Sequence, residues 1–197
     1  MRAGGGRPPH DGSRPRAALA LRYLLLSGVV IGVVGLAGRW VSWPILTSTL
    51  GPTAYTFVAH PESETSRFRN ALIGHSAGLG VGLGVLIVFG LLHCPPVSTT
   101  GTLSFLQAAA AATAVGVTVA VLELTDSHHA PAAATALLVT TGLAKPGAPL
   151  IGLVLGLAIV ITLGPLIGRL PLPAVLAPRT RRAANHARGD EAALGDG

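Results

Sequence analysis

Four nearly continuous apolar runs constrain this chain more than any other feature. They cover residues 17–38, 71–92, 102–124 and 149–167. A helix of about 20 residues is long enough to span a hydrocarbon core of about 30 Å. Only 11% of the residues are charged, compared with about 25% in soluble domains. The sequence therefore predicts an all-α, polytopic transmembrane bundle with four long membrane helices.

Two shorter apolar segments, residues 45–59 and 132–144, lie between these runs. A helix of about 15 residues spans only about 22 Å. Gly51-Pro52 interrupts the first segment, and Pro131 precedes the second. We expect broken or re-entrant segments, which a membrane tolerates only where protein or a water-filled cavity surrounds them. The order long, short, long occurs twice, so a two-fold repeat with a central binding site is possible.

Glycines four residues apart mark the run 71–92. Gly74, Gly78 and Gly82 form one such series, and Gly80 and Gly84 form another. Small residues at this spacing let helix backbones approach closely in membranes. The spacing predicts a closely packed face on this helix.

The number of membrane crossings stays open between four and six. If the short segments cross, Arg67 and Arg69 lie on the same side as both termini, and the neutral loop 93–101 lies on the other side. The positive-inside rule favours this arrangement. If the short segments only dip into the bilayer there are four crossings, as their length favours.

Both ends of the chain are polar and rich in arginine. Residues 1–16 and 171–197 lack apolar periodicity, so we predict disordered tails around a membrane domain of residues 17–170. Arginine at both ends predicts cytoplasmic termini. We expect a multi-pass protein in the plasma membrane of a bacterium. The net charge of +6 then favours contact with lipid headgroups rather than nucleic acid, and the small size suggests a homo-oligomer.

A polar stretch before the second short segment contains His128 and His129. Adjacent histidines on a helix point about 100° apart, so we expect no metal site. One interpretation is an interfacial turn, with Asp126 or Ser127 as N-cap and Pro131 in the first helical turn. The other is a helix N-terminus inside a cavity, whose free N–H groups suit a small anion. A nearby imidazole could then add a proton.

A second polar group, Arg69, Asn70 and His75, opens the run 71–92. It is either a surface cap or an anion site, in which Arg69 attracts the ion and His75 faces the interior. Polar residues at membrane depth usually face the inside of a bundle. We expect no enzyme and no cofactor, because the chain has no nucleophile motif, phosphate loop or dinucleotide fingerprint.

Three runs resemble the HPP family of small integral membrane proteins. Residues 69–75 resemble its Arg-Asn-Val-Ile-Gly-Gly-His piece, and residues 49–54 resemble Ser-Leu-Gly-Ala-Ser-Ala. Residues 129–137 resemble the His-Pro-Pro motif and its continuation, with Ala130 in place of the first proline and Ala133 in place of a glycine. The resemblance covers roughly residues 18–170.

The resemblance implies a four-helix transmembrane fold and, as some members are linked to nitrite, a transporter or channel for a small inorganic anion. By motif match the substrate-binding residues are Arg69, Asn70, His75, His129 and Pro131. The alternative is a non-transporting membrane scaffold or sensor that acts through a partner. Substrate identity, coupling and oligomeric state stay open.

Overall fold

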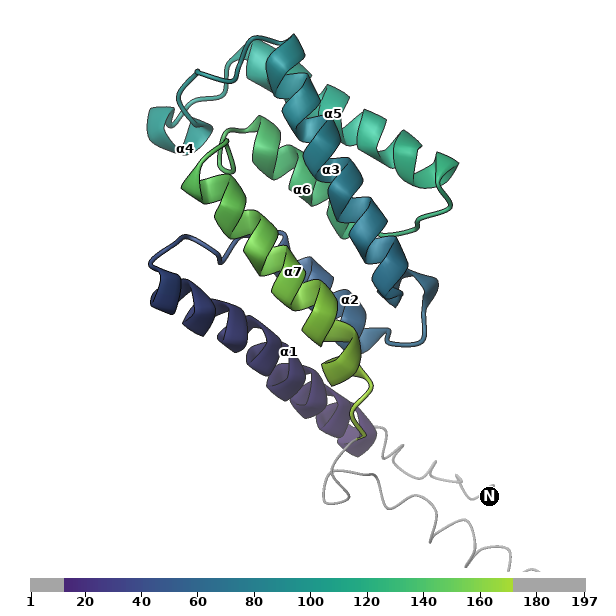
Figure 1. Ribbon diagram of the computed structural model, residues 1–197. Coiled ribbons are helices and arrows are strands. Elements are labelled where there is room, and N and C mark those ends of the chain that lie inside the picture. The colour runs from purple at the N-terminus through teal and green to yellow at the C-terminus, as the bar shows by residue number, and fades with distance from the viewer. Residues whose placement is uncertain (1–12, 172–197) are drawn as a thin grey trace, which may run out of the picture. The chain divides into compact units, whose positions relative to one another are not determined.

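The structure is a computed structural model that describes residues 13–171, and these residues form helices joined by loops (Figure 1). The elements are α1 Ser13–Val41, α2 Leu50–Ala59, η1 Glu64–Ser66, α3 Phe68–Val88, α4 Val97–Thr100, α5 Phe105–Leu124, α6 Pro131–Thr140 and α7 Ala148–Gly168. Residues 25–170 form one compact unit, to which the packing described below belongs. Residues 13–24 belong to a separate unit and contribute the helical start of α1.

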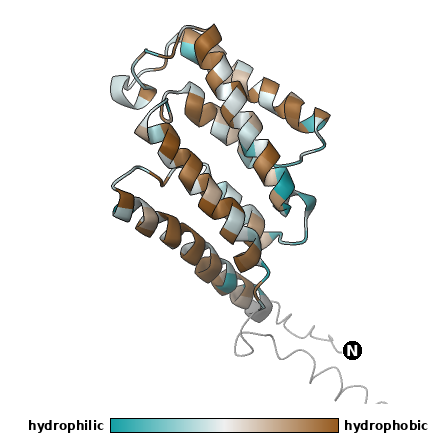
Figure 2. Cartoon of the chain, in the orientation of Figure 1, coloured by the Kyte–Doolittle hydropathy of each residue, from teal (hydrophilic) through white to brown (hydrophobic). Residues whose placement is uncertain are grey.

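The four long helices of the prediction are confirmed. Within the described residues, α1, α3, α5 and α7 are each long and apolar enough to cross a membrane, and the brown of apolar residues is plainest along α1 and α7 in Figure 2. The third helix starts later than predicted because Ser104 and Gln107 form a capping box that fixes its first turn. The first begins at Ser13, within the predicted tail, while the rest of both predicted tails lies outside the described residues.

The expected break inside the segment 45–59 is wrong in its position. Gly51 and Pro52 lie in the first turn of an unbroken α2. Proline is tolerated there because the first N–H groups of a helix have no intrahelical partner to lose. The non-helical part comes earlier, at residues 44–47.

The segment 44–58 follows α7 along nearly its whole length. A Cβ at Gly152 would lie 2.7 Å from the Pro44 carbonyl oxygen, and a Cβ at Gly156 would lie 2.6 Å from that of Ile45. A Cβ at Gly168, near the other end of α7, would meet the Phe57 carbonyl oxygen. Gly152 and Gly168 are about 24 Å apart along the helix axis. The non-helical residues 44–47 and α2 together therefore extend farther along α7, and so across the membrane, than α2 would alone.

The segment 129–145 follows α3 in the same manner. A Cβ at Gly74 would lie 3.1 Å from the His129 Cβ, and a Cβ at Gly82 would lie 2.9 Å from the Val139 Cβ. Farther along, the Lys145 ammonium donates a hydrogen bond of 3.0 Å to the Leu91 carbonyl. The short segment of each half thus packs on a long helix of the other half, as a two-fold repeat requires.

The loops consequently gather at two ends of the unit. We call the end that carries residues 60–69 and the C-terminus of α7 the basic end. We call the end that carries residues 91–101 and 141–147 the neutral end, because its loop 93–101 has no charged residue and Lys145 is half-buried and bonded to the Leu91 carbonyl. Each short segment runs from one end towards the other, so the geometry favours six crossings. Arg67, Arg69 and Arg169 then lie at one membrane face, in agreement with the positive-inside rule.

Substitution of Gly78 by alanine should destabilise the fold. The added methyl group would meet the Ala132 carbonyl oxygen, and overpacking of this kind costs about 1–3 kcal/mol. Gly80→Ala is the matched control, because a Cβ there meets nothing within 4 Å. Thermal unfolding in detergent, followed by circular dichroism, should show a lower midpoint for Gly78→Ala alone. Equal midpoints would contradict the described packing of α6 on α3.

The six-crossing arrangement predicts that Ser42 and Ser98 share a membrane face and that Glu62 lies on the opposite one. Single-cysteine variants at these positions, in a Cys94→Ala background, can be labelled with an impermeant maleimide in intact cells and in inverted vesicles. Ser42→Cys and Glu62→Cys should label in different preparations. Labelling of these two variants from the same side would show instead that the segment 44–58 does not cross.

Candidate functional site

Five buried polar side chains meet where α2, α3 and α6 come together. They are Thr49, Thr53, His75, His129 and Thr135, and each has an exposed fraction of 2% or less. We refer to these five residues as the polar chain. Such a group inside an apolar bundle is costly unless its members hydrogen-bond to one another, which makes it the candidate site.

Local sequence places each member of the polar chain. His75 follows Gly74 on α3, and the missing side chain there lets the backbone at His129 approach. Thr53 lies one turn into α2 from Thr49, and its hydroxyl donates to the Thr49 carbonyl over 2.9 Å. Thr135 lies one turn beyond Pro131 on α6. The close backbone approach therefore brings short hydroxyl side chains within reach of the imidazoles.

His75 is the centre of the polar chain. Its Nδ1 lies 2.8 Å from the Thr135 hydroxyl, and its Nε2 lies 3.1 Å from the Thr53 hydroxyl. The same Nε2 lies 3.1 Å from Nε2 of His129, and the two rings are 4.8 Å apart in an edge-to-face arrangement. Every ring nitrogen of His75 thus has a partner.

The polar chain continues in both directions from His75. Towards the basic end, Nδ1 of His129 lies 2.8 Å from the Thr65 carbonyl oxygen. Away from the histidines, the Thr135 hydroxyl lies 3.0 Å from that of Thr49. The Thr49 hydroxyl also lies 3.3 Å from the Pro131 carbonyl oxygen. A continuous line of hydrogen bonds therefore joins the loop before α3 to the N-terminus of α6.

The carbonyl at one end fixes the proton positions when both imidazoles are neutral. The Thr65 carbonyl can only accept, so His129 carries its proton on Nδ1 and accepts at Nε2. His75 then donates from Nε2 to His129 and Thr53, and its Nδ1 accepts from the Thr135 hydroxyl. The Thr49 hydroxyl donates to Thr135. Each nitrogen and hydroxyl is satisfied in this assignment, which follows from the network.

The structure brings three of the five predicted site residues together. His75 and His129 belong to the polar chain, and Pro131 is the buried first residue of α6, whose carbonyl oxygen lies 3.3 Å from the Thr49 hydroxyl. Arg69 is exposed at the start of α3. Asn70 is buried but donates to the Glu64 carbonyl over 3.0 Å, which ties η1 to α3. Arg69 and Asn70 therefore lie outside the polar chain.

The turn before α6 differs from the prediction in its cap. The N-cap position is Ala130, with no side-chain hydrogen bond, so the expected cap by Asp126 or Ser127 is wrong. The Ser127 N–H instead donates to the Leu122 carbonyl and completes the end of α5. The placement of Pro131 in the first turn is confirmed.

The first amides of α6 are not free for an anion. Pro131 has no N–H, while Ala132 donates to the His129 carbonyl and Ala133 to that of Ala130. The prediction of unpaired N–H groups at this helix start is therefore wrong for these residues. Hydrogen-bond donors at the site come from side chains instead.

His128 points away from its neighbour. Its ring is about half exposed and lies 3.6 Å from the Asp126 carboxylate and 3.9 Å from that of Glu123. Among residues 13–171, no group of three histidine, cysteine or acidic side chains is arranged to hold a metal ion. The two adjacent histidines consequently have different surroundings.

Sequence reasoning missed Thr49, Thr53 and Thr135. All three lie in or next to the short apolar segments, within the runs that resemble the family motifs. The sequence did contain one indication of a shared site, because residues four apart, such as Thr49 and Thr53, lie on the same face of a helix. Which face turns inward depends on packing against α7 and α3, which hydropathy does not report.

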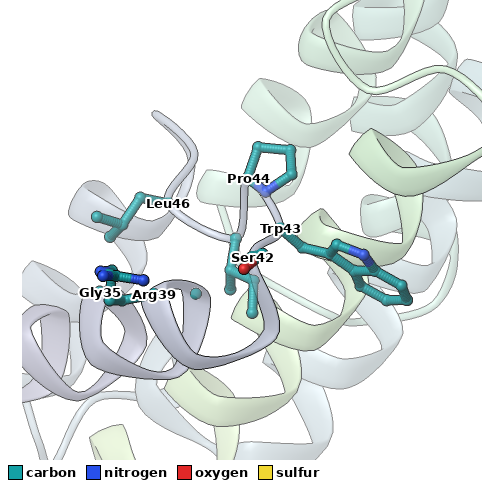
Figure 3. Close-up of a pocket in the computed structure, with 8 residues that line it drawn as sticks. Gly35, Arg39, Ser42, Trp43, Pro44 and Leu46 are labelled. Atoms are coloured by element: carbon teal, nitrogen blue, oxygen red, sulfur yellow. The ribbon is translucent and has the colours of Figure 1, made fainter.

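One hollow has a member of the polar chain in its lining, and a second is lined by the sequence neighbours of two other members. One, of about 230 Å³, lies between α3 and α7 and has His75 in its lining. Another, of about 380 Å³, lies at the neutral end, and its lining includes Ser48 and Ala134, the neighbours of Thr49 and Thr135 in sequence. A third hollow, at the end of α1, is lined by Arg39, Ser42 and Trp43 among others (Figure 3) and contains no member of the polar chain.

Comparisons with known proteins bear on the family. The family model described as HPP, transmembrane region, matches residues 13–174, which include all described helices. The search of curated proteins gave no match. The search of solved structures gave no match either. With four apolar helices of membrane-spanning length and a match over most of its length, the chain belongs to the HPP family of integral membrane proteins.

Proposed function

We propose that this protein carries a small inorganic anion of the nitrite type across the membrane by way of the polar chain. The observation that supports this most is the buried, hydrogen-bonded set of three hydroxyls and two imidazoles inside a largely apolar bundle. Polar residues at this depth are costly and are typically functional. We place the protein in the plasma membrane of a bacterium, with both termini in the cytoplasm.

The chemistry of the polar chain suits an anion better than a cation. Threonine hydroxyls and imidazole N–H groups can donate hydrogen bonds to an anion. The polar chain contains no carboxylate, which a cation site generally uses. The acidic residues among positions 13–171 are all exposed, and they are Glu62, Glu64, Glu123 and Asp126. Neutral donors also bind an anion weakly enough to release it, as transport requires.

The surroundings of the polar chain differ between the two ends. At the neutral end, the lining of one hollow includes Ser48 and Ala134, which are the sequence neighbours of the buried Thr49 and Thr135. At the basic end, the hydrogen bond from His129 to the Thr65 carbonyl closes the polar chain against the loop before α3. In this proposal the anion enters from the neutral end and leaves after His129 separates from Thr65.

Nitrite uptake into proteoliposomes tests the role of His129. We expect His129→Ala to lower the initial rate about tenfold, since the variant lacks the imidazole hydrogen bond to the anion, and a hydrogen bond to a charged partner contributes about 1.5 kcal/mol. His128→Ala is the matched control, because that ring is exposed and outside the polar chain. Its rate should equal that of the unchanged protein.

Equal rates for both histidine variants would remove His129 from the transport path. No uptake above empty liposomes by well-folded protein would mean another substrate or no transport. The scaffold or sensor alternative would then be favoured.

Arg69 should act only by long-range attraction. It is exposed at the basic end, where its charge raises the local anion concentration. We predict that Arg69→Ala reduces nitrite flux by less than about fivefold, and that the reduction disappears at high ionic strength because salt screens exposed charges. The measurement is the rate at which nitrite supplied at the basic end is transported, at low and at high concentrations of potassium gluconate. A salt-independent loss of all flux would instead place Arg69 in the binding site.

A further inference from the structure

We propose that the polar chain also holds one proton, which His75 takes up at Nδ1 when the anion enters, so that the two ions cross together. The inference rests on the proposed function, because the anion supplies the compensating charge. It identifies the coupling ion and the atom that binds it, which the anion proposal alone leaves open.

The polar chain accepts an added proton without movement of any ring or backbone atom. With Nδ1 protonated, His75 donates to the Thr135 hydroxyl across the existing 2.8 Å. Thr135 then rotates its hydroxyl to donate to Thr49 over 3.0 Å, and Thr49 donates to the Pro131 carbonyl over 3.3 Å. Every donor again meets an acceptor. Two hydroxyl rotations therefore convert the neutral arrangement into the protonated one.

His129 is less suited to take the first proton. Its Nδ1 already donates to the Thr65 carbonyl, and its Nε2 accepts from His75. A proton added at that Nε2 would face the N–H of His75 across 3.1 Å, so two donors would oppose each other. His129 can instead share the proton of His75 through this hydrogen bond, which spreads the positive charge over both rings.

The proton needs the anion as counter-charge. A buried ion without a partner is costly in apolar surroundings. The surroundings of His129 include the apolar ring of Phe57, and the centroids of the two rings are 6.1 Å apart. The charged and titratable groups around the pair are exposed except for Lys145, which is half-buried beyond the end of α6 and donates to the Leu91 carbonyl. The exposed ones are Tyr55, His60, Glu62, Glu64, Arg67, Arg69, Glu123, Asp126, His128 and Arg169. An anion next to the protonated pair makes the site neutral overall.

The proton balance of one cycle is simple. A proton from the solution at the neutral end forms the N–H bond at Nδ1 of His75. That N–H bond breaks when the proton leaves with the anion to the solution at the basic end. No electron is transferred, and the net charge moved per cycle is zero.

Thr135 offers a matched set of variants. Thr135→Val keeps the shape of the side chain but removes the acceptor for a protonated Nδ1. Thr135→Ser keeps the hydroxyl. Thr113→Val is the control, because the Thr113 hydroxyl on α5 is exposed and donates only to its own helix, over 2.8 Å to Ala109. Size-exclusion chromatography and circular dichroism identify any variant that fails to fold.

The test measures nitrite and internal pH together in proteoliposomes that contain a pH-sensitive dye, with empty liposomes as the baseline. We expect about one proton per nitrite ion, because the charges enter together, and no effect of a potassium diffusion potential. Thr135→Val should lose the proton-coupled uptake, Thr135→Ser should recover it relative to Thr135→Val, and Thr113→Val should leave it unchanged. Nitrite uptake without protons, or equal coupling in Thr135→Val and Thr135→Ser, would overturn this inference and leave the anion proposal intact.

A second measurement applies if nitrite does not cross at all. Nitrogen-15 NMR of labelled histidine in nanodiscs reports which ring nitrogens carry protons. We expect His75 to carry its proton on Nε2 alone at first and, on acidification with nitrite present as the counter-charge, to gain one on Nδ1 before His129 becomes doubly protonated. This order of protonation would support His75 as the proton-binding residue even if the protein did not transport nitrite. A different order, or no protonation of His75, would reject the proton site.

Discussion

Close backbone contact between the interrupted segments and the glycine faces of two long helices is the constraint on which the rest of the structure depends. On α3 the contact runs past Gly74, Gly78 and Gly82, and on α7 past Gly152 and Gly168. Any larger side chain at these places would meet carbonyl oxygens or packed side chains. Because the contact is this close, the non-helical backbone is enclosed by protein, the condition under which a membrane tolerates it.

The same contact determines the chemistry of the site. Threonine side chains reach only a few ångströms, so Thr135 can bond to His75 only where the backbones of α6 and α3 come close, and Thr53 reaches the same ring from α2. The resulting network has no formal charge of its own. It can therefore be buried at modest cost and still respond to an ion that enters, since its hydroxyls rotate and its imidazoles change protonation.

Much of this fold could be predicted from hydropathy alone, and the site only in part. The four long helices follow from apolar length, and His75 follows from its depth in α3. Arg69 lies six residues before His75, or about 240° around the helix, so both residues do not share one face. The continuity of α2 and the roles of the threonines depend on packing between distant segments, about which residue order gives little information.

The central claim is that an anion occupies the polar chain next to His75 and His129. Solid-state NMR of the protein in bilayers can measure the coupling between nitrogen-15 nitrite and carbon-13 in the imidazole rings. We predict coupling to these two rings and none to the exposed ring of His128, and we predict that the double variant His75→Gln, His129→Gln no longer binds nitrite. Bound nitrite that couples to neither ring would contradict the account.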